Sequence, residues 1–372
     1  SATCRYVPSG YLGGRRASAT DKTSGSRLMN NWWQHPSKVI CQSSRQLAIT
    51  RQQQLTKPAG SLGLLEQVAV DFAGWQQREI AQLDNIQICV FAGDHGVVEE
   101  GVSAFPQVVT GEMVRNFVSG GAAISVIARH ISATFSVVNM GLVARLDGVA
   151  DVINCSIAQG TNNFSKATAM DSDQMANALQ AGAEQINSDT ELFIGGEMGI
   201  GNSTSAAAIV SAVLGLSEDQ TVGKGTGVDE AGLASKRAVI KQAIILHKQR
   251  LTTPEGILTC LGGFEIAALV GAYIRCAQLG VPILIDGYIS SAAALLACEF
   301  NPSARSWMLF AHRSQEPGHE YILAALKASP LLDLQLRLGE GSGAGVALPL
   351  VKMALALHES MATFEQAQVS NT

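Results

Sequence analysis

Short apolar runs alternate with longer stretches of helical periodicity over most of the chain. Each run has hydrophobic residues at consecutive positions, which is typical of strands buried on both faces. We predict strands at 86–92, 134–139, 191–194, 281–285 and 306–310, with 147–156 as a candidate for a further strand. Between them we predict helices at 106–130, 171–187, 204–214, 229–249, 254–261, 264–279, 290–299 and 317–328. This alternation indicates an α/β fold, in which helices cover both faces of a parallel sheet.

Both ends of the chain have helical patterns without strands. Residues 30–54 predict one or two helices, 64–80 predict another, and 346–367 predict the last. Because neither end contributes to the alternation of strands and helices, we expect both ends to form a small helical subdomain beside the sheet.

This pattern divides the chain into three parts. We expect a large α/β catalytic domain at 55–349 and a helical subdomain formed by 29–54 and 350–372. Residues 1–28 are rich in Ser, Gly, Thr and Arg and have no periodicity. We expect this stretch to be an extension that is foreign to the functional protein or lacks fixed order.

The composition narrows the class of protein. The chain has 372 residues, 47% of them hydrophobic, with 37 glycines and a net charge of −5. The chain has no long basic run of the kind that binds nucleic acid. It also has no apolar stretch that reaches the ~20 residues needed to span a membrane. The 7 cysteines are odd in number and form no C-x-x-C pair, which favours a reducing cytoplasm and argues against zinc.

Polar and glycine-rich segments follow the predicted strands. Ligands bind at the carboxyl ends of strands in open parallel sheets. We therefore expect Asp94, Glu197, Asp286 and His312, which all come just after or at the end of a strand, to face one crevice.

The segment GGEMGIGNST at 195–204 joins a strand to a helix. Its glycines and the polar residues at the helix start could present N–H groups to a phosphate. The alternative is a plain tight turn. The spacing fits neither a Walker A loop nor a dinucleotide fingerprint.

A second glycine-rich segment, RLGEGSGAG at 337–345, precedes the last predicted helix. It surrounds one carboxylate, Glu340, with glycines, and Arg337 stands three residues earlier. Glu340 is either a catalytic base or a surface acid in a flexible turn.

Other candidates stay open at this point. Lys224, Lys236 and Arg237 are all possible phosphate partners, and Asp286 fits either a ribose hydroxyl or a helix N-cap. The pair Asp94-His95 has no further histidine at metal-ligand spacing, so we predict no metal. Without a nucleophile motif, group transfer at a phosphorylated sugar is one natural fit.

Several motifs resemble one family, and they occur in its order from about residue 30 to the end. The chain resembles nicotinate-nucleotide–dimethylbenzimidazole phosphoribosyltransferases, which make α-ribazole phosphate for the lower ligand of cobalamin. The motifs are KPAGSLG at 57–63, FAGDHGV at 91–97, GVSAFPQ at 101–107, GGEMGIGNS at 195–203, GKGTGVD at 223–229, IDG at 285–287, AHRS at 311–314 and LGEGSGA at 338–344.

The resemblance implies a reaction and its residues. Nicotinate mononucleotide and 5,6-dimethylbenzimidazole would give α-ribazole 5′-phosphate and nicotinate, with inversion at the anomeric carbon and no cofactor. Glu340 would be the general base, and Glu197 would stabilise positive charge on the ribose. The implied substrate-binding residues are Ser103, Gln107, Gly199, Gly201, Asn202, Ser203, Lys236, Asp286, Gly287, Arg337, Leu338 and Gly339.

Among these, Ser103 and Gln107 would border the base pocket, Lys236 and Arg337 would lie near the phosphate, and Asp286 would reach the ribose hydroxyls. The resemblance also implies a Rossmann-like sheet and a homodimer. Gly93 and Gly111 depart from the pattern. The competing hypotheses are a related phosphoribosyltransferase or nucleoside phosphorylase that uses another base, and a non-catalytic nucleotide-binding module.

Overall fold

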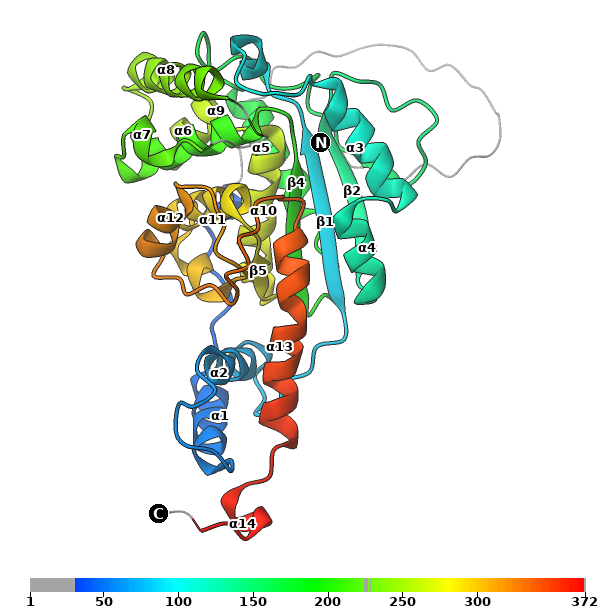
Figure 1. Ribbon diagram of the computed structural model, residues 1–372, viewed down its shortest axis with the longest axis vertical. Helices are drawn as coiled ribbons and strands as arrows, with labels where there is room; N and C mark the ends of the chain where they lie inside the picture. The colour runs from blue at the N-terminus through cyan, green and yellow to red at the C-terminus, as the bar shows by residue number, and fades with distance from the viewer. Residues whose placement is uncertain (1–30, 224–226, 228, 371–372) are drawn as a thin grey trace, which may run out of the picture.

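A six-stranded parallel sheet forms the centre of the computed structural model (Figure 1), which describes residues 31–223, 227 and 229–370. The strand order is β3-β2-β1-β4-β5-β6, the Rossmann order, and every adjacent pair is parallel. The strands are β1 (Ile86–Gly93), β2 (Thr134–Gly141), β3 (Val152–Asn154), β4 (Leu192–Met198), β5 (Ile283–Ile285) and β6 (Met308–Phe310). The α/β prediction is confirmed, and the candidate strand within 147–156 is the short edge strand β3.

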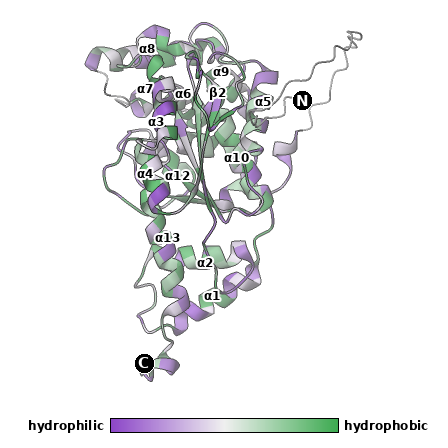
Figure 2. Cartoon of the chain, turned by 90° about the vertical axis from the view of Figure 1, so that its right-hand side faces the viewer, coloured by the Kyte–Doolittle hydropathy of each residue, from purple (hydrophilic) through white to green (hydrophobic). Residues whose placement is uncertain are grey.

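Helices cover both faces of this sheet (Figure 1). Helices α5 (Ser172–Ala183), α10 (Phe264–Leu279) and α11 (Tyr288–Phe300) lie on one face. Helices α3 (Val108–Ser119), α4 (Ala123–His130) and the start of α13 (Ser342–Ser360) lie on the other. Hydrophobic residues fill the strands and α10 in the middle of the molecule (Figure 2).

The remaining helices lie around this core or at the chain ends. They are η1 (Trp32–Gln34), α1 (Gln42–Gln54), α2 (Leu64–Gln76), η2 (Gly96–Glu100), α6 (Asn202–Leu214), α7 (Glu218–Thr221), α8 (Glu230–His247), α9 (Pro254–Leu261), η3 (Pro302–Trp307), α12 (His319–Ala325) and α14 (Phe364–Ala367). None of the helices within the described residues is long and apolar enough to cross a membrane.

Glycine allows α5 and α10 to pack backbone against backbone. A Cβ atom on Gly182 would lie 1.8 Å from the carbonyl oxygen of Ala268, and one on Gly271 would lie 2.0 Å from that of Leu179. Such distances are impossible for any larger residue without movement of a helix. The close contact keeps α10 against the sheet, and α10 also carries Glu265, which lies beneath the functional site.

Several helices have boundaries that differ from the predicted ones, and two of these differences have a clear cause or consequence. The predicted helix 106–130 is two helices, because α3 ends at Gly120, whose φ of 84° closes the helix in the left-handed conformation. The last helix begins earlier than predicted, at Ser342, so the second half of the glycine-rich segment is helical. It ends at Ser360, and Thr363 then caps the separate short helix α14.

The strand predicted at 191–194 continues to Met198 as β4. Glu197 is therefore part of a strand and not of a flexible loop. Positions 195 and 196 of this strand require glycine, because close neighbours leave no room for a side chain.

Helices α1 and α2 meet the end of α13 below the sheet (Figure 1). Arg51 on α1 donates hydrogen bonds to the carbonyl oxygens of His358 at 2.7 Å and Glu359 at 2.6 Å. Helix α2 packs against both α1 and α13. The division at residues 54 and 350 stays a prediction. The extension at 1–28 lies outside the described residues.

Candidate active site

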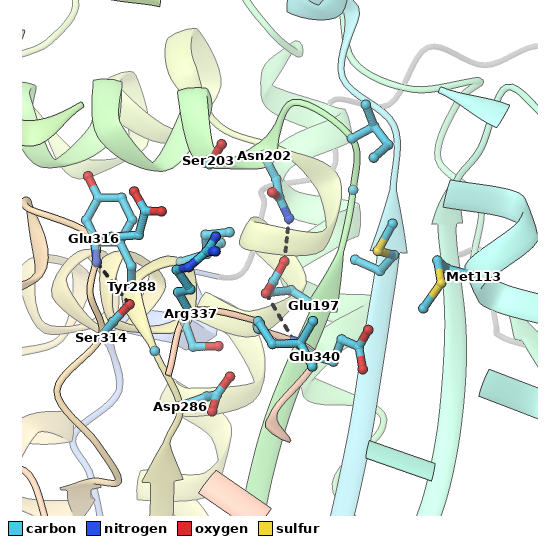
Figure 3. Close-up of a pocket in the computed structure, with 18 of the residues that line it drawn as sticks. Met113, Glu197, Asn202, Ser203, Asp286, Tyr288, Ser314, Glu316, Arg337 and Glu340 are labelled. Carbon is cyan, nitrogen blue, oxygen red and sulfur yellow. Dashed lines mark hydrogen bonds between the residues drawn. The ribbon is translucent and has the colours of Figure 1, made fainter. Parts of the chain in front are cut away.

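A cavity of about 450 Å³ opens at the carboxyl edge of the sheet (Figure 3). The ends of β4, β5 and β6, the start of α3 and the segment before α13 all contribute to its wall. It is lined by Phe105, Val109, Met113, Glu197, Met198, Gly199, Ile200, Asn202, Ser203, Asp286, Gly287, Tyr288, Ile289, Ser290, His312, Ser314, Glu316, Arg337, Leu338, Gly339 and Glu340.

Most of the predicted site residues lie in this wall. Gly199, Asn202, Ser203, Gly287, Arg337, Leu338 and Gly339 accompany the three carboxylates Glu197, Asp286 and Glu340. Lys236 does not line the cavity, but its Nζ donates a 3.1 Å hydrogen bond to Ser203 Oγ, which does.

Three predicted residues lie behind or beside the cavity. Gly201 is the N-cap of α6, with φ of 98°. Gln107 donates a 2.8 Å hydrogen bond from Nε2 to the carbonyl oxygen of His95, just before α3 begins. Ser103 lines a separate hollow that also includes Asp229.

The expectation that four polar residues share one crevice holds for Glu197, Asp286 and His312, but not for Asp94. Asp94 is fully buried, and its Oδ2 accepts a 2.9 Å hydrogen bond from the N–H of Val143. The carboxyl end of β1 therefore directs Asp94 toward the chain after β2. Burial, the main cause, raises the pKa of Asp94.

Glu340 occupies an unusual backbone conformation. Its φ is 65°, and Gly339 and Gly341 on either side have φ of 88° and 85°. A left-handed conformation is uncommon for a residue with a side chain and often marks a functional site. The Glu340 carbonyl oxygen lies directly over Gly196, where a Cβ atom would be only 2.2 Å away. The glycines thus place this loop against β4.

The Glu340 carboxyl group is buried, with only 6% of the residue exposed. Burial raises its pKa, the backbone N–H of Ile124 opposes that rise, and the charge of Asp286 adds to it. Within the described residues, Oε2 has no hydrogen-bond partner. A buried carboxyl group with a raised pKa and an unpaired oxygen suits a general base.

Glu197 lies beside Glu340 (Figure 3). Its Oε1 accepts a 3.4 Å hydrogen bond from the N–H of Glu340, and its Oε2 accepts one from Asn202 Nδ2. Burial is the main reason that the pKa of Glu197 lies well above its ordinary value, and the negative charges of Asp286 and Glu265 raise it further. This site therefore favours the neutral acid unless a positive charge comes near.

Asp286 connects β5 to the start of α13. Its Oδ1 accepts a 2.8 Å hydrogen bond from the N–H of Ala344, and its Oδ2 accepts a 3.1 Å bond from that of Gly341. Of the two roles left open for Asp286, the helix cap is present, but on α13 and not on α11, the helix that follows it in sequence. We call this arrangement the Asp286 clamp.

His312 packs beside the clamp. Its Nε2 lies 3.5 Å from Asp286 Oδ1, and a Cβ atom on Gly343 would lie 2.1 Å from its Cδ2. Burial lowers the pKa of His312, but the hydrogen bond and charge of Asp286 outweigh burial, so the pKa is raised. Gly343 is therefore needed for the first turn of α13 to approach this histidine.

The phosphate-binding prediction concerns the start of α6. Two N–H groups of the predicted cradle are already used: Ile200 donates to Thr110 Oγ1 at 3.1 Å, and Asn202 donates to the Gly199 carbonyl at 3.0 Å. The cradle is therefore narrower than predicted. The Ser203 hydroxyl and the buried Lys236 ammonium, whose pKa is lowered mainly by burial, remain beside the helix N-terminus.

The other candidate cations differ in position. Arg337 is exposed and lines the cavity. Arg237 pairs with Asp219 at 3.0 Å on the surface, away from the cavity wall. Lys224 lies outside the described residues. Among Lys236 and Arg237, the structure therefore brings only Lys236 to the site.

An apolar wall was missed from the sequence. Phe105, Val109 and Met113 line the cavity together with the polar residues. Val109 and Met113 are four residues apart on α3 and so lie on one helix face, a signal that the sequence did contain. Within the described residues, no group of three or more His, Cys, Asp or Glu could hold a metal ion.

The two unexpected glycines are both at tight positions. A Cβ atom on Gly93 would lie 2.8 Å from Glu265 Oε2, and one on Gly111 would lie 2.9 Å from the Cβ of Ala144. Neither residue lines the cavity.

Comparison with known proteins assigns this chain to a class. Residues 38–369 match a family described as phosphoribosyltransferase, so the protein is a transferase of that class. Nicotinate-nucleotide–dimethylbenzimidazole phosphoribosyltransferase of Pseudomonas savastanoi pv. phaseolicola is 53% identical over 348 residues, which cover 92% of this chain and 99% of that one. The enzyme of the same name from Pseudomonas aeruginosa strain UCBPP-PA14 is 53% identical over 344 residues, covering 91% and 98%.

Solved structures agree with these relatives. The crystal structure of this enzyme from Thermus thermophilus has a TM-score of 0.84 and 39% identity, and the match covers 90% of this chain and 100% of that one. The chain belongs to the nicotinate-nucleotide–dimethylbenzimidazole phosphoribosyltransferase family.

The Asp286 clamp leads to a first prediction. In Asp286→Asn, an NH₂ group would face one of the two backbone donors. A buried donor without a partner costs about 1–3 kcal/mol. We expect the amide hydrogens of Gly341 and Ala344 to exchange roughly ten- to a hundredfold faster in hydrogen–deuterium exchange. Asp333→Asn, at an exposed carboxylate that pairs with Arg313, is the matched control. Equal exchange in Asp286→Asn and the parent protein would show that the clamp does not hold the loop.

Proposed function

We propose that this protein transfers the phosphoribosyl group of nicotinate mononucleotide to 5,6-dimethylbenzimidazole, giving α-ribazole 5′-phosphate and nicotinate. The observation that carries the proposal is the position of Glu340, a buried carboxyl group with a raised pKa on the wall of a cavity that also has an apolar side. Family membership and the names of the relatives support the choice of substrates.

The two sides of the cavity fit the two substrates. The phosphate would lie near Lys236 and Ser203 at the start of α6, with Arg337 at the rim. The flat aromatic acceptor would lie against Phe105, Val109 and Met113. The ribose would then lie between them, beside Glu197 and Glu340.

The chemistry follows from this placement. One ring nitrogen of the benzimidazole attacks the anomeric carbon and forms the new C–N bond, while the bond to nicotinate breaks and its electron pair leaves with nicotinate. Attack opposite the leaving group inverts the configuration from β to α. Glu340 accepts the proton from the other ring nitrogen, so that the product is neutral at the azole.

Glu197 would stabilise the positive charge that develops on the ribose. Positive charge favours the ionised carboxylate, which offsets the burial that raises the pKa of Glu197 in the absence of such a charge. Asn202 holds one oxygen of Glu197 and the Glu340 N–H contacts the other, so its orientation is fixed before the substrate binds.

Substrate dependence tests the proposed reaction. We expect release of nicotinate from its mononucleotide, followed by chromatography, to require a benzimidazole and to yield one α-ribazole 5′-phosphate per nicotinate. Inorganic phosphate in place of the benzimidazole should give no release. Release driven by phosphate would instead identify a nucleoside phosphorylase, and binding without any release would identify a non-catalytic module.

Removal of the proposed base tests the mechanism. Glu340→Gln keeps the shape of the side chain but cannot accept a proton at neutral pH. We expect turnover to drop by about 10²–10⁴-fold, the usual contribution of a positioned general base. The Kd of nicotinate mononucleotide, measured by calorimetry, should change little. Glu184→Gln on the exposed end of α5 is the control. Turnover equal to that of the parent protein would remove Glu340 from the mechanism.

The raised pKa of Glu340 predicts a pH dependence. Only the ionised carboxylate can accept a proton, so the single-turnover rate should fall as the pH decreases through that raised pKa, above the ordinary glutamate value of about 4.3. The residual rate of Glu340→Gln should not show this decrease. Protonation of the azole itself would lower the rates of both the parent protein and Glu340→Gln. Comparison of the two proteins therefore distinguishes it from protonation of Glu340. A parent rate that is independent of pH while chemistry is limiting would contradict a carboxylate base.

A further inference from the structure

A buried histidine–glutamate pair lies beneath the cavity and takes no part in the proposed chemistry. His95 follows β1, and Glu265 is in the first turn of α10; both residues are 0% exposed. His95 Nε2 lies 2.7 Å from Glu265 Oε1. Burying two such polar groups is unfavourable unless they bond each other well, so the pair calls for an explanation.

The His95 side chain supports the glycine loop on the phosphate side. A Cβ atom on Gly199 would lie 3.4 Å from His95 Cδ2, and one on Gly201 would lie 3.2 Å from His95 Cβ. Little space therefore remains between His95 and the loop, so we expect a change in the position of His95 to displace the start of α6.

The His95 backbone supports the acceptor side. Its carbonyl oxygen accepts the 2.8 Å hydrogen bond from Gln107 Nε2, at the residue before α3. Helix α3 carries Val109 and Met113 of the apolar wall and is also tied to the glycine loop, because Thr110 Oγ1 accepts from the Ile200 N–H at 3.1 Å. His95 thus touches both sides of the cavity.

The position of His95 depends on Glu265. A Cβ atom on Gly263 would lie 2.3 Å from His95 Cε1 and 2.6 Å from Glu265 Oε2, so the imidazole and the carboxylate fill the space left by this glycine. The segment around His95 is also fixed by the Gly96 N–H, which donates to the Thr161 carbonyl at 3.0 Å.

We propose that the His95–Glu265 pair is a positioning element that sets the glycine loop and the start of α3 at the correct separation, and so couples the mononucleotide side of the cavity to the acceptor side. The identity of the two ligands rests on the proposed function. Neither residue touches substrate, so the effect of the pair acts through Gly199–Gly201 and Gln107.

A pair of substitutions at Glu265 separates positioning from general stability. Glu265→Ala removes the partner of His95 and should weaken binding of both nicotinate mononucleotide and 5,6-dimethylbenzimidazole by about tenfold, the effect of one lost buried hydrogen bond. Glu265→Gln keeps an oxygen that accepts from His95 Nε2–H and should restore both Kd values to within about threefold. The turnover number at saturation should change less than either Kd, because Glu340 and Glu197 remain.

The matched control is His358→Gln in the helical subdomain. His358 is also buried, with Nδ1 2.9 Å from Gln52 Nε2 and Nε2 3.1 Å from the Glu79 carbonyl oxygen. This variant should lower the melting temperature and leave both Kd values unchanged. If Glu265→Ala does not fold, Gly263→Ala replaces it, because its Cβ atom pushes on His95 from the same side; it should weaken both ligands in the same way.

Calorimetry measures each Kd without turnover. The test of the positioning role is therefore separate from the test of the proposed function, which depends on turnover by the parent protein. Weaker binding of both ligands, with rescue by Glu265→Gln, supports the positioning role. The role is overturned if both Kd values equal those of the parent, if only one ligand is affected, or if His358→Gln weakens both ligands equally.

Discussion

Two hydrogen bonds that Asp286 accepts from the start of α13 hold the centre of this site together. The acceptor oxygens lie 2.8 and 3.1 Å from the N–H groups of Ala344 and Gly341, directly after the left-handed residues Gly339 and Glu340. Because Asp286 comes at the end of β5, the clamp attaches the loop to the sheet. Glu340 is therefore held rigidly against the sheet although it lies in a loop, and the general-base role proposed for it would require such support.

The clamp also has an electrostatic consequence. Burial is the largest cause of the raised pKa of both Glu340 and Glu197, and the charge of Asp286 raises both values further. Two backbone N–H groups offset the cost of burying Asp286 itself. The three carboxyl groups therefore differ: Asp286 accepts hydrogen bonds from two backbone N–H groups, whereas burial and the charge of Asp286 raise the pKa of both Glu340 and Glu197. In the proposed mechanism, such carboxyl groups would suit a ribose that becomes positive during the reaction.

The sequence predicted the sheet well because its buried strands are short apolar runs, whereas the equally apolar helix α10 is recognisable by its greater length. It could not predict the role of Asp286, whose partner Ala344 is 58 residues away and leaves no local signal. The sequence placed Asp94 wrongly. The position of Asp94 at the end of β1 predicts at which edge of the sheet it lies, but not toward which neighbouring segment its side chain points. The cradle at 199–203 was predicted from composition, yet the use of the Ile200 and Asn202 N–H groups depends on tertiary contacts.

The glycines of the site are explained by close packing of the backbone and not by a need for flexibility. Gly196 leaves room for the Glu340 carbonyl, and Gly343 leaves room for His312. A Cβ atom on Gly199 would lie only 2.3 Å from the carbonyl oxygen of Gly93. Each glycine removes a side chain where two parts of the backbone or a buried ring must touch. A loop that is flexible would lose entropy on binding, but these contacts fix the loop before any ligand arrives. High glycine content here therefore indicates close packing of a preorganised site, and the same reasoning explains why the buried His95–Glu265 pair can transmit its position to both sides of the cavity.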